Sequence, residues 1–116
     1  MIRTEAIETI IATLEHAQAR PVMFTSSAVS VEAMTSFING FGLACLKLGY
    51  RYNRETYEAA FTQRGWCRFE NRAEPLSEKS GKNMKDTGMS DNEIIHELFA
   101  IEIDCWKILR DASPAL

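Results

Sequence analysis

The sequence predicts an all-α fold in a single domain spanning residues 1–116, with four main helices and one short helix. Apolar residues recur at three- and four-residue spacing in several segments, as on the buried face of a helix. Each of these segments is bounded by helix-capping or helix-stopping residues. No alternating pattern typical of a strand continues beyond three or four residues.

The first two helices are delimited by their caps. The apolar spacing predicts a helix over residues 5–19, capped by Thr4 and stopped at Pro21. Ser30 is a favourable N-cap for the second helix, and Gly49 stands where a left-handed residue ends a helix. The predicted apolar seam of this second helix consists of Met34, Ile38, Phe41, Cys45 and Leu48.

Two glycines, Gly40 and Gly42, interrupt the second helix. Each weakens a helix by roughly 1 kcal/mol relative to alanine, so each needs a reason. We expect close backbone packing at these positions, with a bend or the approach of a ligand as the alternatives.

A third helix is predicted over residues 54–64, capped by Asn53 and ended by Gly65. Between Gly65 and Ser90 lie 24 residues, which is long for a structureless loop in a compact domain. We therefore predict a short helix over residues 77–86.

The last helix begins at the clearest boundary in the chain. Ser90 and Glu93 form the pattern of a capping box, and the apolar spacing continues to about Arg110. Apolar residues cover more than half of the circumference of this helix, which is more than one neighbour can bury. It is expected at the centre of the bundle, with self-association as the alternative. The candidates for an interface between two copies are Leu43, Leu46, Phe99 and Trp106.

Charge is distributed unevenly along the chain. The overall charge is −3, whereas residues 47–72 carry six basic and three acidic residues and residues 90–116 carry two basic and six acidic residues. The basic segment is also rich in aromatic residues, a combination suited to binding an anionic or aromatic ligand. The alternative is that it docks on the acidic last helix, within one chain or across a dimer. The candidate ligand-binding residues are Arg51, Tyr57, Arg64, Trp66, Arg68 and Glu102.

Glu102 is the exceptional residue of the last helix, because helical geometry places it inside the apolar arc. A carboxylate in that position must be paired, hydrogen-bonded or protonated. We expect an arginine partner from the basic segment, chosen among Arg51, Arg54, Arg64 and Arg68.

Three motifs suggest chemistry that the rest of the sequence does not support. Glu93 and His96 have the spacing used by di-iron bundles, but no second such motif accompanies them, so no metal or cofactor is predicted. Residues 85–94 resemble the turn of a helix-turn-helix, but Asp91, Glu93 and Glu97 would repel phosphates. Cys67 stands beside an arginine without a nearby base, and whether it is reactive stays open.

These observations predict a small helical protein that binds a partner or a ligand, forms a homodimer and lacks a catalytic motif. The three cysteines form no disulfide framework, and neither a membrane span nor a secretory signal fits the sequence, so a cytoplasmic location is expected. The alternative is a small helical enzyme or sensor with an Arg/Tyr/Trp-lined pocket near Glu102. A nucleic-acid-associated regulator is a further alternative, disfavoured by the acidic last helix.

Overall fold

The structure, a computed structural model, describes residues 3–21, 30–69, 72–75, 84 and 87–112. It confirms the predicted all-α fold. The four helices are α1 (Arg3–Ala19), α2 (Val31–Lys47), α3 (Arg54–Gln63) and α4 (Asp91–Ala112). A small hairpin of two strands, β1 (Trp66–Phe69) and β2 (Arg72–Pro75), lies between α3 and α4 in the sequence.

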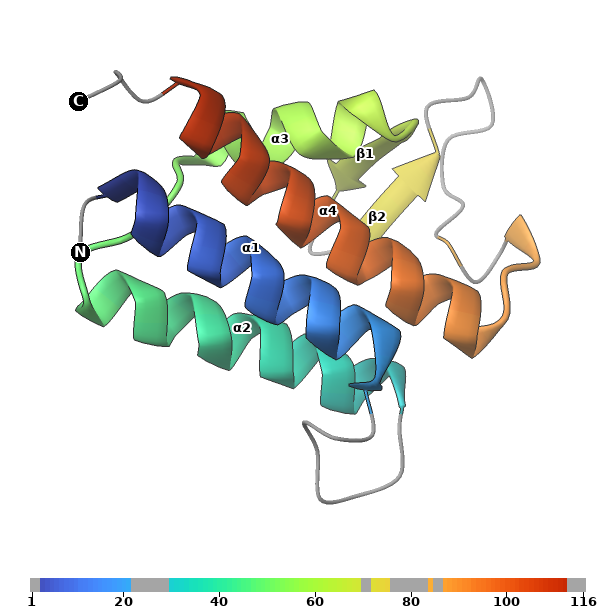
Figure 1. Cartoon of the computed structure of the whole chain (residues 1–116). Coiled ribbons are helices and arrows are strands. Elements are labelled where there is room, and N and C mark those ends of the chain that lie inside the picture. Colours follow the sequence, from blue (N-terminus) through green and yellow to red (C-terminus); the bar gives the residue numbers. More distant parts are fainter. Residues whose placement is uncertain (1–2, 22–29, 70–71, 76–83, 85–86, 113–116) are drawn as a thin grey trace.

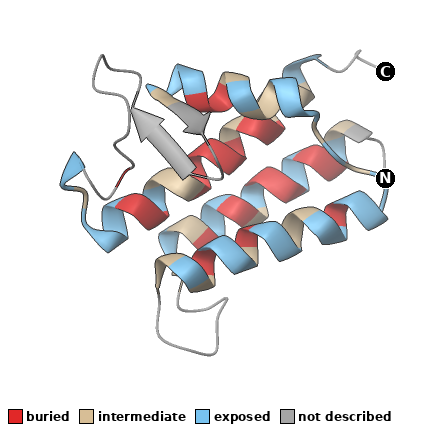
Figure 2. Cartoon of the chain, turned by 180° about the vertical axis from the view of Figure 1, so that it is seen from behind, coloured by how far each residue is buried: buried red, intermediate tan, exposed pale blue. Residues whose placement is uncertain are grey.

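Helix α4 is the centre of the bundle, as its wide apolar arc predicts, because α1, α2 and α3 all pack against it. In Figure 1, α1 and α2 lie on one side of α4, and α3 with the hairpin lies on the other. The core therefore forms two adjoining clusters that share α4. Figure 2 shows the buried residues on the faces that the helices turn toward one another.

Local capping fixes where three of the helices begin. Ser30 Oγ accepts a hydrogen bond from Ala33 N at 3.1 Å, and Asn53 Oδ1 accepts one from Thr56 N at 2.8 Å. The capping box is complete: Ser90 N donates to Glu93 Oε1 at 3.0 Å, and Glu93 N donates to Ser90 Oγ at 3.2 Å. These bonds satisfy backbone donors that a helix N-terminus otherwise leaves unpaired, and they confirm all three predicted caps.

Two details differ from the expectations, and a third expectation is not tested. Helix α1 already includes Thr4, so this residue is not the N-cap. Leu48 is 77% exposed and is not part of the seam of α2, because it is the C-cap residue, beyond the last turn. The predicted helix over residues 77–86 falls almost entirely outside the described residues.

The hairpin pairs antiparallel, with Trp66 opposite Pro75 and Phe69 opposite Arg72. Each strand has only four residues, too few to establish the period-two pattern by which a strand is recognised. Within the described part of the chain, no helix combines the length and the apolar character needed to cross a membrane.

Candidate functional site

Glu102 is buried in the middle of α4, with 4% of its surface exposed. Its two carboxylate oxygens accept hydrogen bonds from neutral donors: Tyr52 Oη donates to Oε1 at 2.6 Å, and Trp106 Nε1 donates to Oε2 at 3.0 Å. The sequence analysis correctly predicted a carboxylate that needs a partner, but the predicted arginine partner is wrong. Among the described side chains, no arginine or lysine forms an ion pair with Glu102.

The two donors reach Glu102 for different local reasons. Trp106 lies one helical turn further along α4, so both side chains project from the same face. Tyr52 lies in the connector between α2 and α3, which leaves α2 through Gly49 at a φ of 92° and enters α3 at the capping residue Asn53. Because both ends of this connector are fixed by hydrogen bonds, Tyr52 is held over α4.

Two aromatic rings pack against the ring of Tyr52. The Tyr52 ring meets the Trp106 ring edge to face at a centroid distance of 5.2 Å, and it stacks on the Tyr57 ring at 5.9 Å. Tyr57 in turn makes an edge contact with Phe61 at 4.8 Å. Such contacts restrict the ring positions and so hold the hydroxyl in place against the carboxylate.

Burial controls the ionisation of this region. It raises the pKa of Glu102, while the hydrogen bonds from Tyr52 and Trp106 act in the opposite direction. Burial and the nearby Glu102 carboxylate raise the pKa of the Cys45 and Cys105 thiols and of the Tyr52 hydroxyl. Both thiols are buried, and their raised pKa values disfavour the thiolate, which is the reactive form of cysteine.

Glu102 also lines a pocket of about 870 Å³, here called the Glu102 pocket. One wall is apolar and belongs to α2, which contributes Ile38, Leu43 and Leu46. The buried end contains Glu102 and Trp106. The pocket therefore combines an apolar wall with a buried polar group.

Polar and charged groups line another part of the Glu102 pocket. Arg51, Arg54 and Glu58 are exposed side chains that line it. The Arg54 guanidinium is engaged by Glu58, with 3.1 Å between Arg54 Nε and Glu58 Oε1. Because these groups are in contact with water, their charges are more strongly screened than the charge of the buried carboxylate.

The structure separates the candidate residues into two groups. Arg51, Tyr57 and Glu102 line the Glu102 pocket, whereas Arg64 and Trp66 do not. The side chain of Arg68 and that of Cys67 lie outside what the structure describes. Other lining residues were not among the ligand-binding candidates, including Ile38, Asn39, Tyr52, Asn53 and Glu58.

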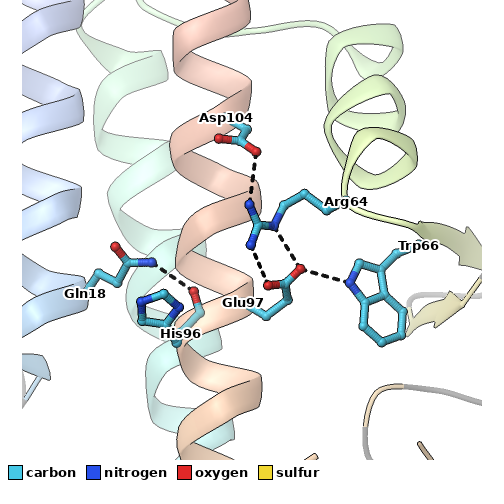
Figure 3. Close-up of polar contacts among 6 residues, drawn as sticks. All are labelled: Gln18, Arg64, Trp66, His96, Glu97 and Asp104. Atoms are coloured by element: carbon cyan, nitrogen blue, oxygen red, sulfur yellow. Dashed lines mark hydrogen bonds and ion pairs between the residues drawn. The ribbon is translucent and has the colours of Figure 1, made fainter.

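Arg64 and Trp66 instead form a polar cluster with α4, which Figure 3 shows. Arg64 Nε and Nη2 donate to the two oxygens of Glu97 at 2.8 and 2.7 Å, and Trp66 Nε1 donates to Glu97 Oε2 at 2.9 Å. Asp104 Oδ2 lies 3.5 Å from Arg64 Nη1. These donors lower the pKa of Glu97 despite its partial burial. Arg64, which belongs to the basic segment, therefore binds the acidic helix α4 of the same chain.

The four interface candidates also divide into two groups. Leu43 and Leu46 are 56% and 42% exposed on α2. Phe99 and Trp106 are buried in the core against α1 and α2, so they have no surface to offer a partner. Their assignment to an interface is wrong because the apolar arc of α4 is covered by the other helices of the chain.

The two glycines of α2 are not explained by close packing. A Cβ atom built on Gly40 or Gly42 would meet no atom of a neighbouring described element within 4 Å. Close backbone packing was the wrong expectation here. Gly42 lines the Glu102 pocket and Gly40 does not, so the approach of a ligand remains a reason for Gly42 alone.

Within the residues that the structure describes, no group of three or more potential metal ligands comes together. The His96 carbonyl accepts a hydrogen bond from Gln18 Nε2 at 3.0 Å, which ties α4 to α1 (Figure 3).

Comparison with known proteins found no matching family model, no similar curated protein and no similar solved structure.

Proposed function

We propose that this protein is a small binding module that holds a small ligand in the Glu102 pocket without transforming it. The observation that carries this proposal is a buried carboxylate that also lines a pocket of about 870 Å³. Ligand pockets typically measure about 300 to 1,000 Å³ and combine a mostly apolar lining with a few fixed polar groups. Glu102 is a fixed polar group of this kind, because Tyr52 and Trp106 hold both of its carboxylate oxygens by hydrogen bonds.

Binding without catalysis has more support than catalysis, because the groups near Glu102 are poor nucleophiles and bases. A catalytic pair needs a nucleophile or a second acid–base group within hydrogen-bond reach. Of the described groups near Glu102, the two thiols and the Tyr52 hydroxyl have raised pKa values, which disfavours their deprotonated, nucleophilic forms. Enzyme activity is the alternative to this proposal. We also propose that the protein works in a reducing compartment such as the cytoplasm.

The test uses Gly42, because this residue lines the pocket and a Cβ atom added there meets no described atom within 4 Å. A set of small aromatic and aliphatic fragments is titrated into the protein while amide NMR signals are recorded. We expect fragments to shift signals around Glu102 and Tyr52 in the wild type. Gly42→Gln should abolish these shifts.

Gly40→Gln is the matched control, since it places the same side chain on the same helix outside the pocket. It should bind the fragments like the wild type. The proposal fails if no fragment perturbs the Glu102 pocket, or if Gly42→Gln binds as well as Gly40→Gln. Native mass spectrometry of freshly purified protein would show in addition whether a ligand is retained.

Self-association is the second candidate, and a specific observation favours it. Leu43 and Leu46 are large apolar side chains, three residues apart on α2, that are 56% and 42% exposed, and exposed apolar patches often mark interaction sites. We propose a homodimer that uses this surface. Sedimentation of the wild type at tens of micromolar should then show a dimer, and the double variant Leu43→Glu/Leu46→Glu should shift it to a monomer. A monomeric wild type under these conditions excludes the dimer.

A role in nucleic-acid binding has less support. The Arg64 guanidinium is already bound to Glu97 and lies near Asp104. It is therefore not available for phosphate contacts, which dominate nucleic-acid affinity.

A further inference from the structure

The Glu102 carboxylate has acceptors for hydrogen bonds that the protein itself leaves unused. An ionised carboxylate accepts about four hydrogen bonds, two on each oxygen. Tyr52 supplies one to Oε1 and Trp106 supplies one to Oε2. Each oxygen therefore has capacity left for a further donor, and Glu102 is one of the residues that line the pocket.

When the Glu102 carboxylate is ionised, no described cation compensates its charge. Buried charges in proteins are normally paired, because taking an ion out of water is costly. Both donors to Glu102 are neutral, and no described lysine or arginine pairs with it. A positive charge delivered by a ligand would supply the missing compensation.

The aromatic lining suits a cation as well. Tyr52 and Tyr57 are partly exposed and line the pocket, whereas Trp106 is 1% exposed at its buried end. The electron-rich faces of tyrosine and tryptophan attract organic cations when a cation lies within about 6 Å of a ring centre. A carboxylate flanked by such rings combines a charge with an apolar surface for the body of the ligand.

An anion fits the same pocket less well. At the buried end it would face the Glu102 carboxylate and be repelled by it. The cations that line the pocket are the exposed Arg51 and Arg54, and Arg54 is already paired with Glu58. An anion could therefore use only groups that are in contact with water, where charge interactions are weak.

From this arrangement we propose that the Glu102 pocket selects an organic ammonium ligand, with the amine bound to the Glu102 carboxylate and an apolar or aromatic body against Leu43 and Leu46. This inference rests on the proposed binding function and specifies its ligand class. Within the site, Tyr52 and Trp106 act as positioning residues that aim the carboxylate.

Three probes of nearly equal size and different charge test the proposal: 2-phenylethylamine, 2-phenylethanol and phenylacetate. Each is titrated into the full chain near neutral pH while amide NMR signals of the pocket are followed. We expect the amine to bind at least about tenfold more tightly than the alcohol, since hydrogen bonds to charged groups contribute about 1.5 to 3 kcal/mol and a factor of ten corresponds to about 1.4 kcal/mol. Phenylacetate should bind most weakly.

Two variants assign the selectivity to Glu102. Glu102→Gln should remove the preference for the amine over the alcohol while leaving the affinity for the alcohol nearly unchanged. Glu15→Gln removes a carboxylate from an exposed position on α1 and should leave the preference intact.

The outcomes separate the two proposals. If the alcohol or phenylacetate binds in the Glu102 pocket as tightly as the amine, the ammonium inference is overturned and the binding function stands. Equal amine preference in Glu102→Gln and in the wild type also overturns the inference. If neither these probes nor any other fragment perturbs the pocket, the binding function itself is wrong and the inference falls with it.

Discussion

Replacing Glu102 with glutamine is expected to change how stability depends on pH more than it changes stability itself. Glutamine has the shape of glutamate, and its Oε1 can accept the hydrogen bond that Trp106 donates. The Tyr52 hydroxyl can turn to accept from the new amide, because a hydroxyl is both donor and acceptor. Both contacts to Glu102 are thus retained without a buried charge. The loss of about 3 to 5 kcal/mol that accompanies a broken buried ion pair is not expected, because no cation is left behind.

The expected pH dependence follows from the direction of the pKa shift. Burial raises the pKa of Glu102 above its ordinary value of 4.5. As pH rises past this ordinary value, the unfolded chain releases the proton before the folded protein does, so the folded state binds more protons and its stability falls. The decline continues until the raised pKa of the folded protein is passed. It amounts to about 1.4 kcal/mol for each unit by which the pKa is raised.

Urea denaturation gives the free energy of unfolding, and it is carried out at several pH values from about 4 to about 8, a range that begins near the ordinary carboxyl pKa. The stability of Glu102→Gln relative to the wild type should improve as pH rises. Other titrating carboxylates, including Glu97 and Glu93 with their lowered pKa values, are present in both proteins and cancel in the difference. Glu15→Gln controls for the loss of one formal charge. A difference between Glu102→Gln and the wild type that is the same at every pH would refute the assignment of Glu102 as a buried carboxylate.

A matched apolar variant measures how much the two hydrogen bonds to Glu102 contribute to the free energy of unfolding. Glu102→Leu leaves the Tyr52 and Trp106 donors without their acceptor, and Trp106 is 1% exposed. An orphaned buried donor costs about 1 to 3 kcal/mol. Glu102→Leu should therefore be clearly less stable than Glu102→Gln. The comparison is made at low pH, where Glu102 of the wild type is also uncharged and can serve as a reference.

Two further predictions concern contacts away from the pocket. Ser90→Ala should lower the free energy of unfolding by about 0.5 to 2 kcal/mol, and coinciding denaturant midpoints would contradict the role of the capping box. Arg64→Lys keeps the charge but loses the two-point contact with Glu97, so we expect a loss of about 1 kcal/mol in thermal or urea unfolding. The control Arg54→Lys, at a side chain that is 86% exposed, should have no measurable effect, and equal losses in the two variants would contradict the structural role of Arg64.

Features that depend on a few neighbouring residues could be predicted from the sequence. The caps at Ser30, Asn53 and Ser90 involve bonds to backbone groups three residues away, so their pattern is visible in the chain itself. The inward direction of Glu102 followed from helical geometry, which is equally local. The central position of α4 followed from the width of its apolar arc.

The partners of Glu102 could not be predicted in this way, because they depend on where a connector crosses α4. Charge alone favoured an arginine, yet Arg51 and Arg54 are exposed while Tyr52 between them turns inward. The signal that could have found Tyr52 is its place immediately before the cap Asn53, which fixes the connector against the core. A pocket near Glu102 was predicted as the alternative, and Arg51 and Tyr57 do line it. The part of its lining that belongs to α2 could not be predicted, because it depends on how α2, the connector, α3 and α4 pack together.

The two proposed uses of α2 are linked by geometry. Leu43 and Leu46 line the Glu102 pocket and also belong to the exposed apolar surface proposed for self-association. A second copy of the chain that covered these leucines would alter access to the pocket, so ligand affinity must differ between the monomer and the dimer. Thermodynamic linkage then requires that a ligand shift the monomer–dimer equilibrium by the same factor as dimerisation changes its affinity. A substitution at Glu102 separates ligand binding from self-association, because Glu102 lies at the buried end of the pocket and is not part of the exposed leucine surface.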